Sequence, residues 1–206
     1  MTDAIRPIIF ARYPTPGQCK TRLIPALGAD GAAALYRELL QRTVTRLAPL
    51  SPILCTTGAP PEAFHALFGA TYDVRPQLDV PDLGERMLAA LSEEAAPADT
   101  GVAARPALIV GSDAPDLDLH HVEAVITRLG DADLALGPAE DGGFWAIGMR
   151  IIDERLFAGV EWSTPGVMLA VANNAARLGL TLAYGPRLAD LDMPQDLERW
   201  PDLAPQ

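Results

Sequence analysis

Short apolar runs rich in β-branched residues alternate with longer stretches of helical periodicity along this chain. The strand-like runs read RPIIFAR, SPILCTT, YDVRP, PALIVGS, ADLALGP, FWAIGMR and LTLAYGP. Apolar positions at helical intervals lie between them, over residues 30–47, 61–68, 83–95, 119–129 and 165–178. Strands that alternate with helices at this spacing predict an α/β protein with a mostly parallel, doubly wound sheet and helices on both of its faces.

One connection departs from this alternation. Only the segment AEDGG separates the strand-like runs ALGP and FWAIG. A crossover helix needs a longer connection, whereas an Asp-Gly pair favours a tight turn, so these two strands should form an antiparallel hairpin. The sheet is therefore expected to be mixed. Residues 96–105 are rich in Ala, Pro, Gly and Asp without apolar periodicity, and we predict a surface loop there rather than a domain linker.

The composition fits one domain over residues 1–206. With 206 residues, 49% of them hydrophobic, the chain can bury one core and is short for two domains. Its net charge of -11 and scattered basic residues argue against a nucleic-acid or acidic-membrane partner, so we expect a small-molecule ligand. No apolar run is long enough for a membrane span, and the N-terminus lacks a signal-peptide pattern, which favours a cytoplasmic protein. Cys19 and Cys55 lie in unlike settings and imply neither a disulfide framework nor a zinc site.

The first candidate for chemistry is the loop in FARYPTPGQCKTRL, where a strand is expected to end at Arg12. Lys20 is the one lysine among 16 basic residues, which suggests that its position needs a compact point charge. Ligands of open α/β sheets collect at the carboxyl ends of strands, and a loop with Gly17, Lys20 and Arg22 could hold a di- or triphosphate there. The loop is not a Walker A motif, because Cys19 stands where a glycine is required. Lys20 and Arg22 could equally be solvated loop charges, and the local sequence does not decide between the two interpretations.

Two aspartates could hold a divalent cation, Mg²⁺ or Mn²⁺. Asp113 follows the apolar strand of PALIVGSDAPDL, where a carboxylate can hold the metal against phosphate oxygens. A helix-capping role at this place belongs instead to Asp118, which directly precedes a helical pattern. Asp192, in LADLDMPQDLERW, could complete the metal site, but it could also form a capping box with Gln195, and the pattern favours the cap.

Three further features have structural as well as functional explanations. Asp141 and Gly142, in AEDGGFWAIG, are a favourable turn pair without any ligand. Gly84, at the start of LGERM, could let the backbone approach a ligand, although an ordinary amphipathic helix also explains the pattern. Trp162, in EWSTPG, could line an acceptor pocket or belong only to a turn. The histidines lack metal-ligand spacing, and the chain has no GxSxG or Cys/His nucleophile pattern.

Taken in order, six segments together resemble a bacterial family of glycosyltransferase-like GT-A proteins, within the nucleotide-diphospho-sugar transferase superfamily. These segments are FARYPTPGQCKTRL, LGERM, GSDAPDL, GPAEDGGFWAIG, LFAGVEWST and DLDMPQDL. The resemblance covers nearly the whole chain and implies a single GT-A (Rossmann-like) domain. That family is similar in turn to the phospholactate guanylyltransferases and the molybdenum-cofactor guanylyltransferases.

The resemblance also implies roles for individual residues. Those implied to bind the nucleotide are Ala11, Arg12, Lys20, Arg22 and Gly84. Those implied to face the acceptor are Asp141, Gly142, Gly143 and Trp162. Lys20 and Asp113 would carry catalysis, with the metal on Asp113. The first loop lacks the GxGxR glycines of sugar-nucleotide pyrophosphorylases, and GSDAPDL lacks a strict DxD glycosyltransferase motif, so neither activity follows from a motif alone.

Three functional hypotheses remain open from the sequence. The preferred one is Mg²⁺-dependent nucleotidyl transfer from an NTP to a small anionic acceptor, with the Lys20 ammonium and the metal neutralising developing charge. The second is glycosyl transfer from an NDP-sugar to a small-molecule acceptor. The third is a non-catalytic nucleotide-binding domain. The nucleotide base, the acceptor, and the choice between a monomer and a homodimer are not specified by the sequence.

Overall fold

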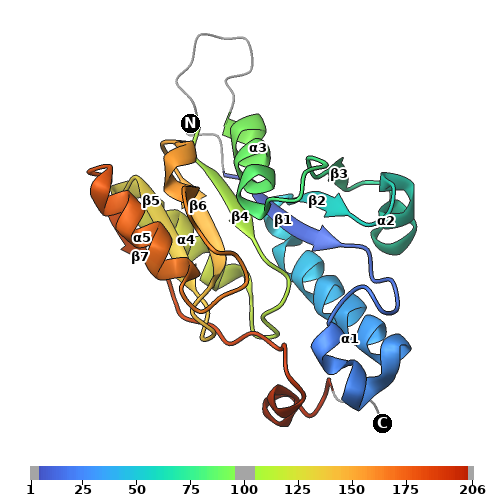
Figure 1. Ribbon diagram of the computed structural model, residues 1–206. Helices are drawn as coiled ribbons and strands as arrows, with labels where there is room; N and C mark the ends of the chain where they lie inside the picture. The colour runs from blue at the N-terminus through green and yellow to red at the C-terminus, as the bar shows by residue number, and fades with distance from the viewer. Residues whose placement is uncertain (1–4, 96–104, 204–206) are drawn as a thin grey trace.

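The computed structural model describes residues 5–95 and 105–203, and its centre is a seven-stranded sheet in the order β3-β2-β1-β4-β6-β5-β7 (Figure 1). The strands are β1 (Pro7–Arg12), β2 (Ile53–Thr57), β3 (Asp73–Pro76), β4 (Ala107–Val110), β5 (Leu134–Pro138), β6 (Phe144–Met149) and β7 (Leu182–Tyr184). Strand β6 runs antiparallel to β4 and β5, while the other neighbouring pairs are parallel. The predicted mixed sheet and its β5–β6 hairpin are therefore confirmed. Residues 96–104 of the predicted surface loop lie outside the described residues.

Five α-helices in the described residues cover both faces of the sheet. They are α1 (Ile24–Leu47), α2 (Pro61–Phe68), α3 (Leu83–Ala95), α4 (Leu119–Asp131) and α5 (Val167–Arg177). Helices α3 and α5 pack on one face, and α1, α2 and α4 pack on the other. Successive residues of a strand serve opposite cores: Ile8 and Ile109 face the α3/α5 side, whereas Ile9 faces the α1/α2/α4 side. The continuous apolar strands of the sequence reflect burial on both faces.

The element boundaries follow the apolar patterns closely, with differences of one to six residues at several helix ends. Helix α1 begins at Ile24 and not at residue 30, because its first turn is joined to the rest across a kink at Gly28, which has φ 70° and ψ 170°. Helix α5 begins at Val167, two residues after the predicted start at 165. The described residues also form short 3-10 turns at Thr21–Leu23, Ala48–Leu50, Glu154–Phe157 and Pro194–Arg199.

The two capping assignments made from the sequence have different outcomes. Asp118 caps α4 as predicted, because its carboxylate accepts the backbone N–H of His121 at 3.1 Å. The prediction of a capping box between Asp192 and Gln195 is wrong. The carboxylate of Asp196 accepts the N–H groups of Asp192 and Met193 at 3.0 and 2.7 Å, so this side chain supports the last turn. The carboxylate of Asp192 is consequently available for other contacts.

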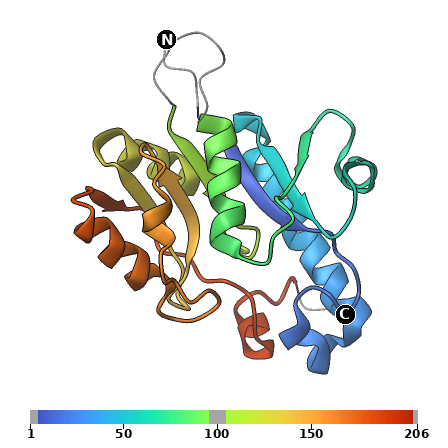
Figure 2. The ribbon, with the colours of Figure 1, turned by 45° about the horizontal axis from the view of Figure 1, so that its top comes forward.

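A third apolar cluster joins the C-terminal segment to α1 and to the 3-10 turn before it. Leu191 and Trp200 pack there against Leu23 and Leu39. Figure 2 shows this red segment beside the blue start of α1. The N–H of Leu191 also donates to the carbonyl oxygen of Asp113 at 3.0 Å. Residues far apart in the sequence thereby meet at the carboxyl edge of β1 and β4.

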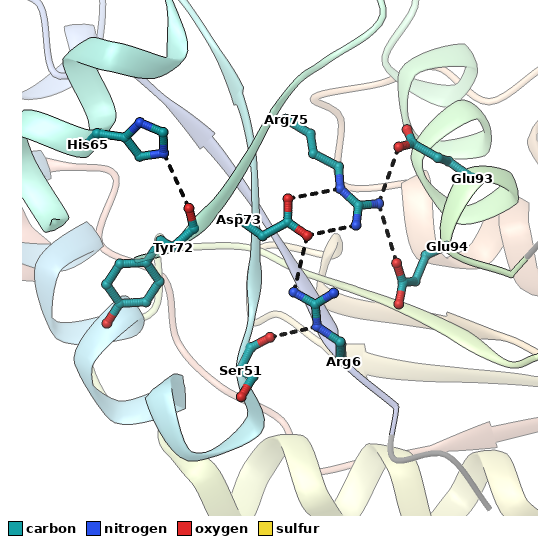
Figure 3. A network of polar contacts seen from close by, with 8 residues as sticks. All are labelled: Arg6, Ser51, His65, Tyr72, Asp73, Arg75, Glu93 and Glu94. Carbon is teal, nitrogen blue, oxygen red and sulfur yellow. Dashed lines mark hydrogen bonds and ion pairs between the residues drawn. The ribbon is translucent and has the colours of Figure 1, made fainter. Parts of the chain in front are cut away.

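An ionic network secures the outer strand β3 at a distance from that edge (Figure 3). The guanidinium groups of Arg75 and Arg6 donate to Asp73 at 2.7 and 3.2 Å. Arg75 also contacts Glu93 and Glu94 of α3, at 3.2 and 3.4 Å. These contacts link β3 to the segment before β1 and to the end of α3.

No described helix is both long and apolar enough to cross a membrane.

Candidate active site

The side chain of Lys20 lies between two carboxylates at the carboxyl edge of the sheet. Its Nζ atom is 2.6 Å from Oδ1 of Asp113 and 2.7 Å from Oδ1 of Asp192. The carbonyl oxygen of Leu191 accepts a third hydrogen bond from Nζ, at 2.7 Å. A lysine ammonium has three N–H donors, so all three are engaged.

Lys20 is a buried ion-pair partner and not a solvated loop charge. Only 5% of its side chain is exposed. Burial by itself would lower the pKa of the ammonium, but the charges of Asp113 and Asp192 outweigh burial and raise this pKa above its ordinary value. Lys20 also has a left-handed backbone conformation with φ 45°, which is costly for a residue other than glycine. The site therefore holds a fixed positive charge.

An open cavity of about 470 Å³ lies beside this ion pair. Three cations line it, because Arg12 and Arg22 accompany Lys20 there. Arg22 Nη1 lies 3.7 Å from Oδ2 of Asp192, and both arginines are otherwise exposed to solvent. The remaining lining residues are Gln18, Cys19, Thr21, Tyr36, Asp113, Asp141, Ser163 and Asp192. A solvent-accessible cavity with three cations is suited to the phosphates of a nucleotide.

The hydroxyl of Tyr36 fixes the end of β1 at this cavity. It accepts the backbone N–H of Arg12 at 3.0 Å and lies 3.3 Å from the Oγ of Ser112. Burial raises the pKa of the tyrosine, with a smaller contribution from Asp113, so the hydroxyl stays neutral. The sequence carries no signal for Tyr36, because it lies in the middle of α1 and is brought to β1 only by packing.

A second cavity, of about 290 Å³, adjoins the first. Its walls are mainly apolar and include Phe10, Leu83, Met87, Phe144 and Trp162. Four residues line both cavities: Asp113, Asp141, Ser163 and Asp192. This shared group is hereafter called the junction. Groups bound in the two cavities would meet at the junction, which is what a transfer reaction requires.

Three of the predicted acceptor residues, Asp141, Gly143 and Trp162, line the second cavity, and Gly142 lies between the first two in the chain. Asp141 is held by the N–H of Gly143, which donates to its Oδ1 at 2.8 Å. Gly142 has φ 93°, and a Cβ atom there would collide with the carbonyl oxygen of Pro165. The Asp-Gly turn is thus pressed against the segment that carries Trp162, and its glycine is needed for packing as well as for the turn.

Two residues predicted to contact the nucleotide, Ala11 and Gly84, do not lie with the cations. Ala11 is buried within β1, and its carbonyl oxygen accepts a hydrogen bond from Gln77 at 3.4 Å. At Gly84 the close approach is made by the ring of Trp162, which would lie 2.8 Å from an added Cβ atom. Neither Ala11 nor Gly84 lines either of the two cavities. Their nucleotide-binding roles stay predictions.

Asp190, two residues before Asp192, also lines the second cavity. Burial, and next the nearby charge of Asp141, raise its pKa to about 6. Its signal in the sequence was the spacing Asp190-Leu191-Asp192, because alternate residues of an extended segment point the same way.

The residues present suit a metal ion that arrives with a nucleotide. Across residues 5–95 and 105–203, no group of three or more His, Cys, Asp and Glu side chains is arranged to hold a metal ion. Asp113 and Asp192 nevertheless supply hard carboxylate oxygens, and Mg²⁺ is commonly held by one or two carboxylates together with substrate phosphates. The two carboxylates would then exchange the Lys20 ammonium for the metal.

Comparison with protein families places most of the chain in one of them. The family described as "Uncharacterized protein conserved in bacteria (DUF2064)" matches residues 39–164. A crystal structure from Desulfovibrio desulfuricans, of a protein provisionally described as a nucleotide-diphospho-sugar transferase, is 33% identical, with a TM-score of 0.80 over 91% of this chain and 82% of that one. No match was found among curated proteins.

More distant solved structures share the fold alone. The inositol-1-phosphate CTP transferase of T. maritima is 13% identical, with a TM-score of 0.57 over 98% of this chain and 96% of that one. The 4-diphosphocytidyl-2C-methyl-D-erythritol synthase of Anaerococcus prevotii is 8% identical, with a TM-score of 0.56 over 96% and 97%. The expected single GT-A-like α/β fold is thus confirmed. The expected likeness to guanylyltransferases stays a prediction.

Proposed function

This chain belongs to the bacterial DUF2064 family and has the fold of nucleotide-using transferases, and from that premise we propose that it is a nucleotidyltransferase. The observation that carries the proposal is the Lys20 ammonium, held 2.6 and 2.7 Å from Asp113 and Asp192 where two cavities meet. A fixed cation beside two metal-binding carboxylates is the arrangement that stabilises charge developing on phosphate oxygens.

The two cavities receive different substrates in this proposal. The triphosphate of an NTP lies in the cation-lined cavity, where Arg12, Lys20 and Arg22 bind its oxygens. The acceptor lies in the smaller, apolar cavity and directs an oxygen atom toward the junction. The acceptor oxygen forms a bond to the α-phosphorus while the bond from that phosphorus to the bridging oxygen breaks. Pyrophosphate leaves, and the proton of a hydroxyl acceptor passes to water.

Lys20 has to change partners for this reaction. Its three donors are engaged by Asp113, Asp192 and the Leu191 carbonyl, so it cannot also donate to phosphate in the arrangement described. Asp113 and Asp192 would hold a Mg²⁺ or Mn²⁺ ion that arrives with the nucleotide, and the ion would supply charge neutralisation at the phosphates. Lys20, no longer engaged by these carboxylates, would donate to the phosphate oxygens. Binding of the metal and binding of the triphosphate are therefore coupled.

Glycosyl transfer is the second candidate. It is favoured by the 33% identity with a protein provisionally described as a nucleotide-diphospho-sugar transferase. The same cations would bind a departing nucleoside diphosphate, and the sugar would occupy the smaller cavity. A non-catalytic nucleotide-binding domain is the third possibility, and it predicts binding without turnover.

A calorimetric titration with the four NTPs and with common NDP-sugars, with and without Mg²⁺, distinguishes these functions. We expect one NTP to bind more tightly than the other NTPs and the NDP-sugars. We expect this preference only when Mg²⁺ is present. Preference for an NDP-sugar would replace nucleotidyl transfer by glycosyl transfer, which a free NDP product would then establish. Binding of neither class would contradict both enzymatic functions.

A further inference from the structure

The indole ring of Trp162 contributes to one wall of the smaller cavity. Apolar side chains form much of the remaining lining, among them Phe10, Met87 and Phe144. At about 290 Å³ the cavity lies at the lower limit of the usual range of ligand pockets, so its occupant is a small molecule. Aromatic walls favour a flat apolar body, because rings pair well in offset-stacked or edge-to-face arrangements.

Two residues that do not line the cavity lie behind the ring of Trp162. The ring of Phe157 meets the indole edge to face, with centroids 5.2 Å apart and an interplanar angle of 79°. A Cβ atom added to Gly84 of α3 would lie 2.8 Å from Cζ2 of the indole and 3.2 Å from Cβ of Phe157. Because neither Gly84 nor Phe157 lines the cavity, a side chain at position 84 would press the indole away from α3 and toward the cavity.

Space, and not backbone conformation, accounts for the glycine at this position. Gly84 lies in the first turn of α3 and is not among the glycines with positive φ. Alanine is the better helix former, so helix propensity alone would favour a side chain here. An added Cβ atom would also lie 2.9 Å from Oδ1 of Asp82, which accepts the N–H of Glu85 at 2.8 Å. The glycine therefore leaves room for the indole and for the support of the first helical turn.

The turn that carries Trp162 is fixed as well. Ser163 has a left-handed backbone conformation with φ 64°, which is costly for a serine. The hydroxyl of Thr164 donates to the carbonyl oxygen of Glu161 at 2.8 Å and closes the turn. Ser163 belongs to the junction, so the turn holds the indole beside the proposed place of transfer. A wall that is fixed before binding selects a ligand by its shape at a small cost in conformational entropy.

We propose that Gly84 and Trp162 together determine which acceptors the smaller cavity takes. The glycine lets the indole lie against α3, and this keeps the cavity open to an acceptor whose reacting oxygen is carried on a flat apolar body. The proposal rests on the transferase function proposed above and identifies the class of its second substrate. It also gives Gly84 a role different from the nucleotide contact that the family resemblance implies.

Titration with phenylpropanol tests the proposal without any nucleotide, and glycerol, which has hydroxyls but no ring, is the comparison. Trp145 also lines the cavity, so the NMR shift of its indole N–H reports binding in every variant. We expect the wild type to bind phenylpropanol and not glycerol. Gly84→Ala should weaken phenylpropanol binding about fivefold or more. Gly130→Ala, in α4, is the matched control, because an added Cβ atom there meets nothing within 4 Å.

The same change in a Trp162→Phe background separates the role of the indole from a general loss of structure. A phenyl ring lacks the indole atom that an added Cβ atom would strike, so Gly84→Ala should have little further effect there. Equal losses of phenylpropanol affinity in the two backgrounds would overturn the proposal. So would a wild type that binds glycerol as tightly as phenylpropanol, or that does not bind phenylpropanol.

A Mg²⁺-dependent NTP titration of the same variants tests the role that the family resemblance implies. If Gly84→Ala weakens NTP binding and leaves phenylpropanol binding unchanged, Gly84 is a nucleotide contact and the proposal fails. Absence of NTP binding by the wild-type chain would instead contradict the transferase function, whatever phenylpropanol shows.

Discussion

At the scale of single residues, Lys20 shows how much of a side chain's role the local sequence predicts. Its rarity and its loop predicted a functional cation, but left a solvated charge equally open. The structure excludes the solvated charge, because Lys20 is buried between carboxylates that are about 90 and 170 residues away along the chain. No pattern within the loop itself could show that contact, which depends on the packing of the C-terminal segment.

Replacing Lys20 by alanine should weaken binding of a triphosphate and spare the free nucleoside. Loss of a charge-assisted hydrogen bond corresponds to about 1.5–3 kcal/mol, or roughly tenfold to a hundredfold in affinity. Calorimetric titration with an NTP and with its nucleoside measures both effects. Arg37→Ala, which removes an exposed cation of α1, is the matched control. Equal losses for the nucleoside and the triphosphate would show that Lys20 does not act on the phosphates.

At the scale of elements, the sequence predicted the strands and most helices because their apolar periods are strong and local. The errors arose where a local rule had a competitor. Asp192 satisfied the pattern of a helix cap, yet Asp196 supplies the hydrogen bonds. At the start of α1, Gly28 has a non-helical backbone conformation, yet the residues before it are also helical. The apolar period predicts only the part of the helix that follows this kink. Both errors lie beside the candidate site, where side chains have partners distant in the sequence.

The free energy of unfolding should depend on pH through Asp73 of strand β3. The pKa of this carboxyl group is lowered chiefly by hydrogen bonds from Arg75 (Figure 3). A lowered carboxyl pKa adds stability above the unfolded value of about 3.8, and this stability is lost as the pH falls through the folded value. Because the side chain is 36% exposed, we expect only about 0.5 kcal/mol. Urea unfolding should show Asp73→Asn less stable than the wild type at neutral pH, with the difference shrinking below about pH 4. A difference that is independent of pH would rule out this ionic contribution.

At the scale of the whole molecule, the candidate site is assembled from three distant parts of the chain. The loop after β1 supplies Lys20, the loop after β4 supplies Asp113, and the C-terminal segment supplies Asp192. The first two were predictable, because parallel strands end at the same edge of a sheet. The third appeared in the sequence only as the less favoured alternative to a helix cap, since its contact with Lys20 depends on the burial of Leu191 against α1.

Leu191→Ala should therefore reduce stability and ligand binding together. Truncating a fully buried leucine costs about 2–5 kcal/mol, and here the cavity would also loosen the segment that carries Asp192. Leu129→Ala, in the core between α4 and the sheet, should cost a similar amount of stability without affecting the site. Urea unfolding and NTP titration well below the melting temperature measure the two effects. Equal NTP affinities in the two variants would contradict the role assigned to the C-terminal segment.

The most direct test of the account is the Mg²⁺ dependence of NTP binding by the wild-type chain and by Asp113→Asn. We predict that Mg²⁺ strengthens NTP binding by the wild type and has little effect on the variant. Without the metal, the variant should bind the NTP at least as tightly as the wild type, because one donor of Lys20 is released. Asp116→Asn is the control, since Asp116 accepts from Trp200 and lines neither cavity. The same Mg²⁺ dependence in Asp113→Asn as in the wild type would contradict the proposed exchange of Lys20 for a metal ion.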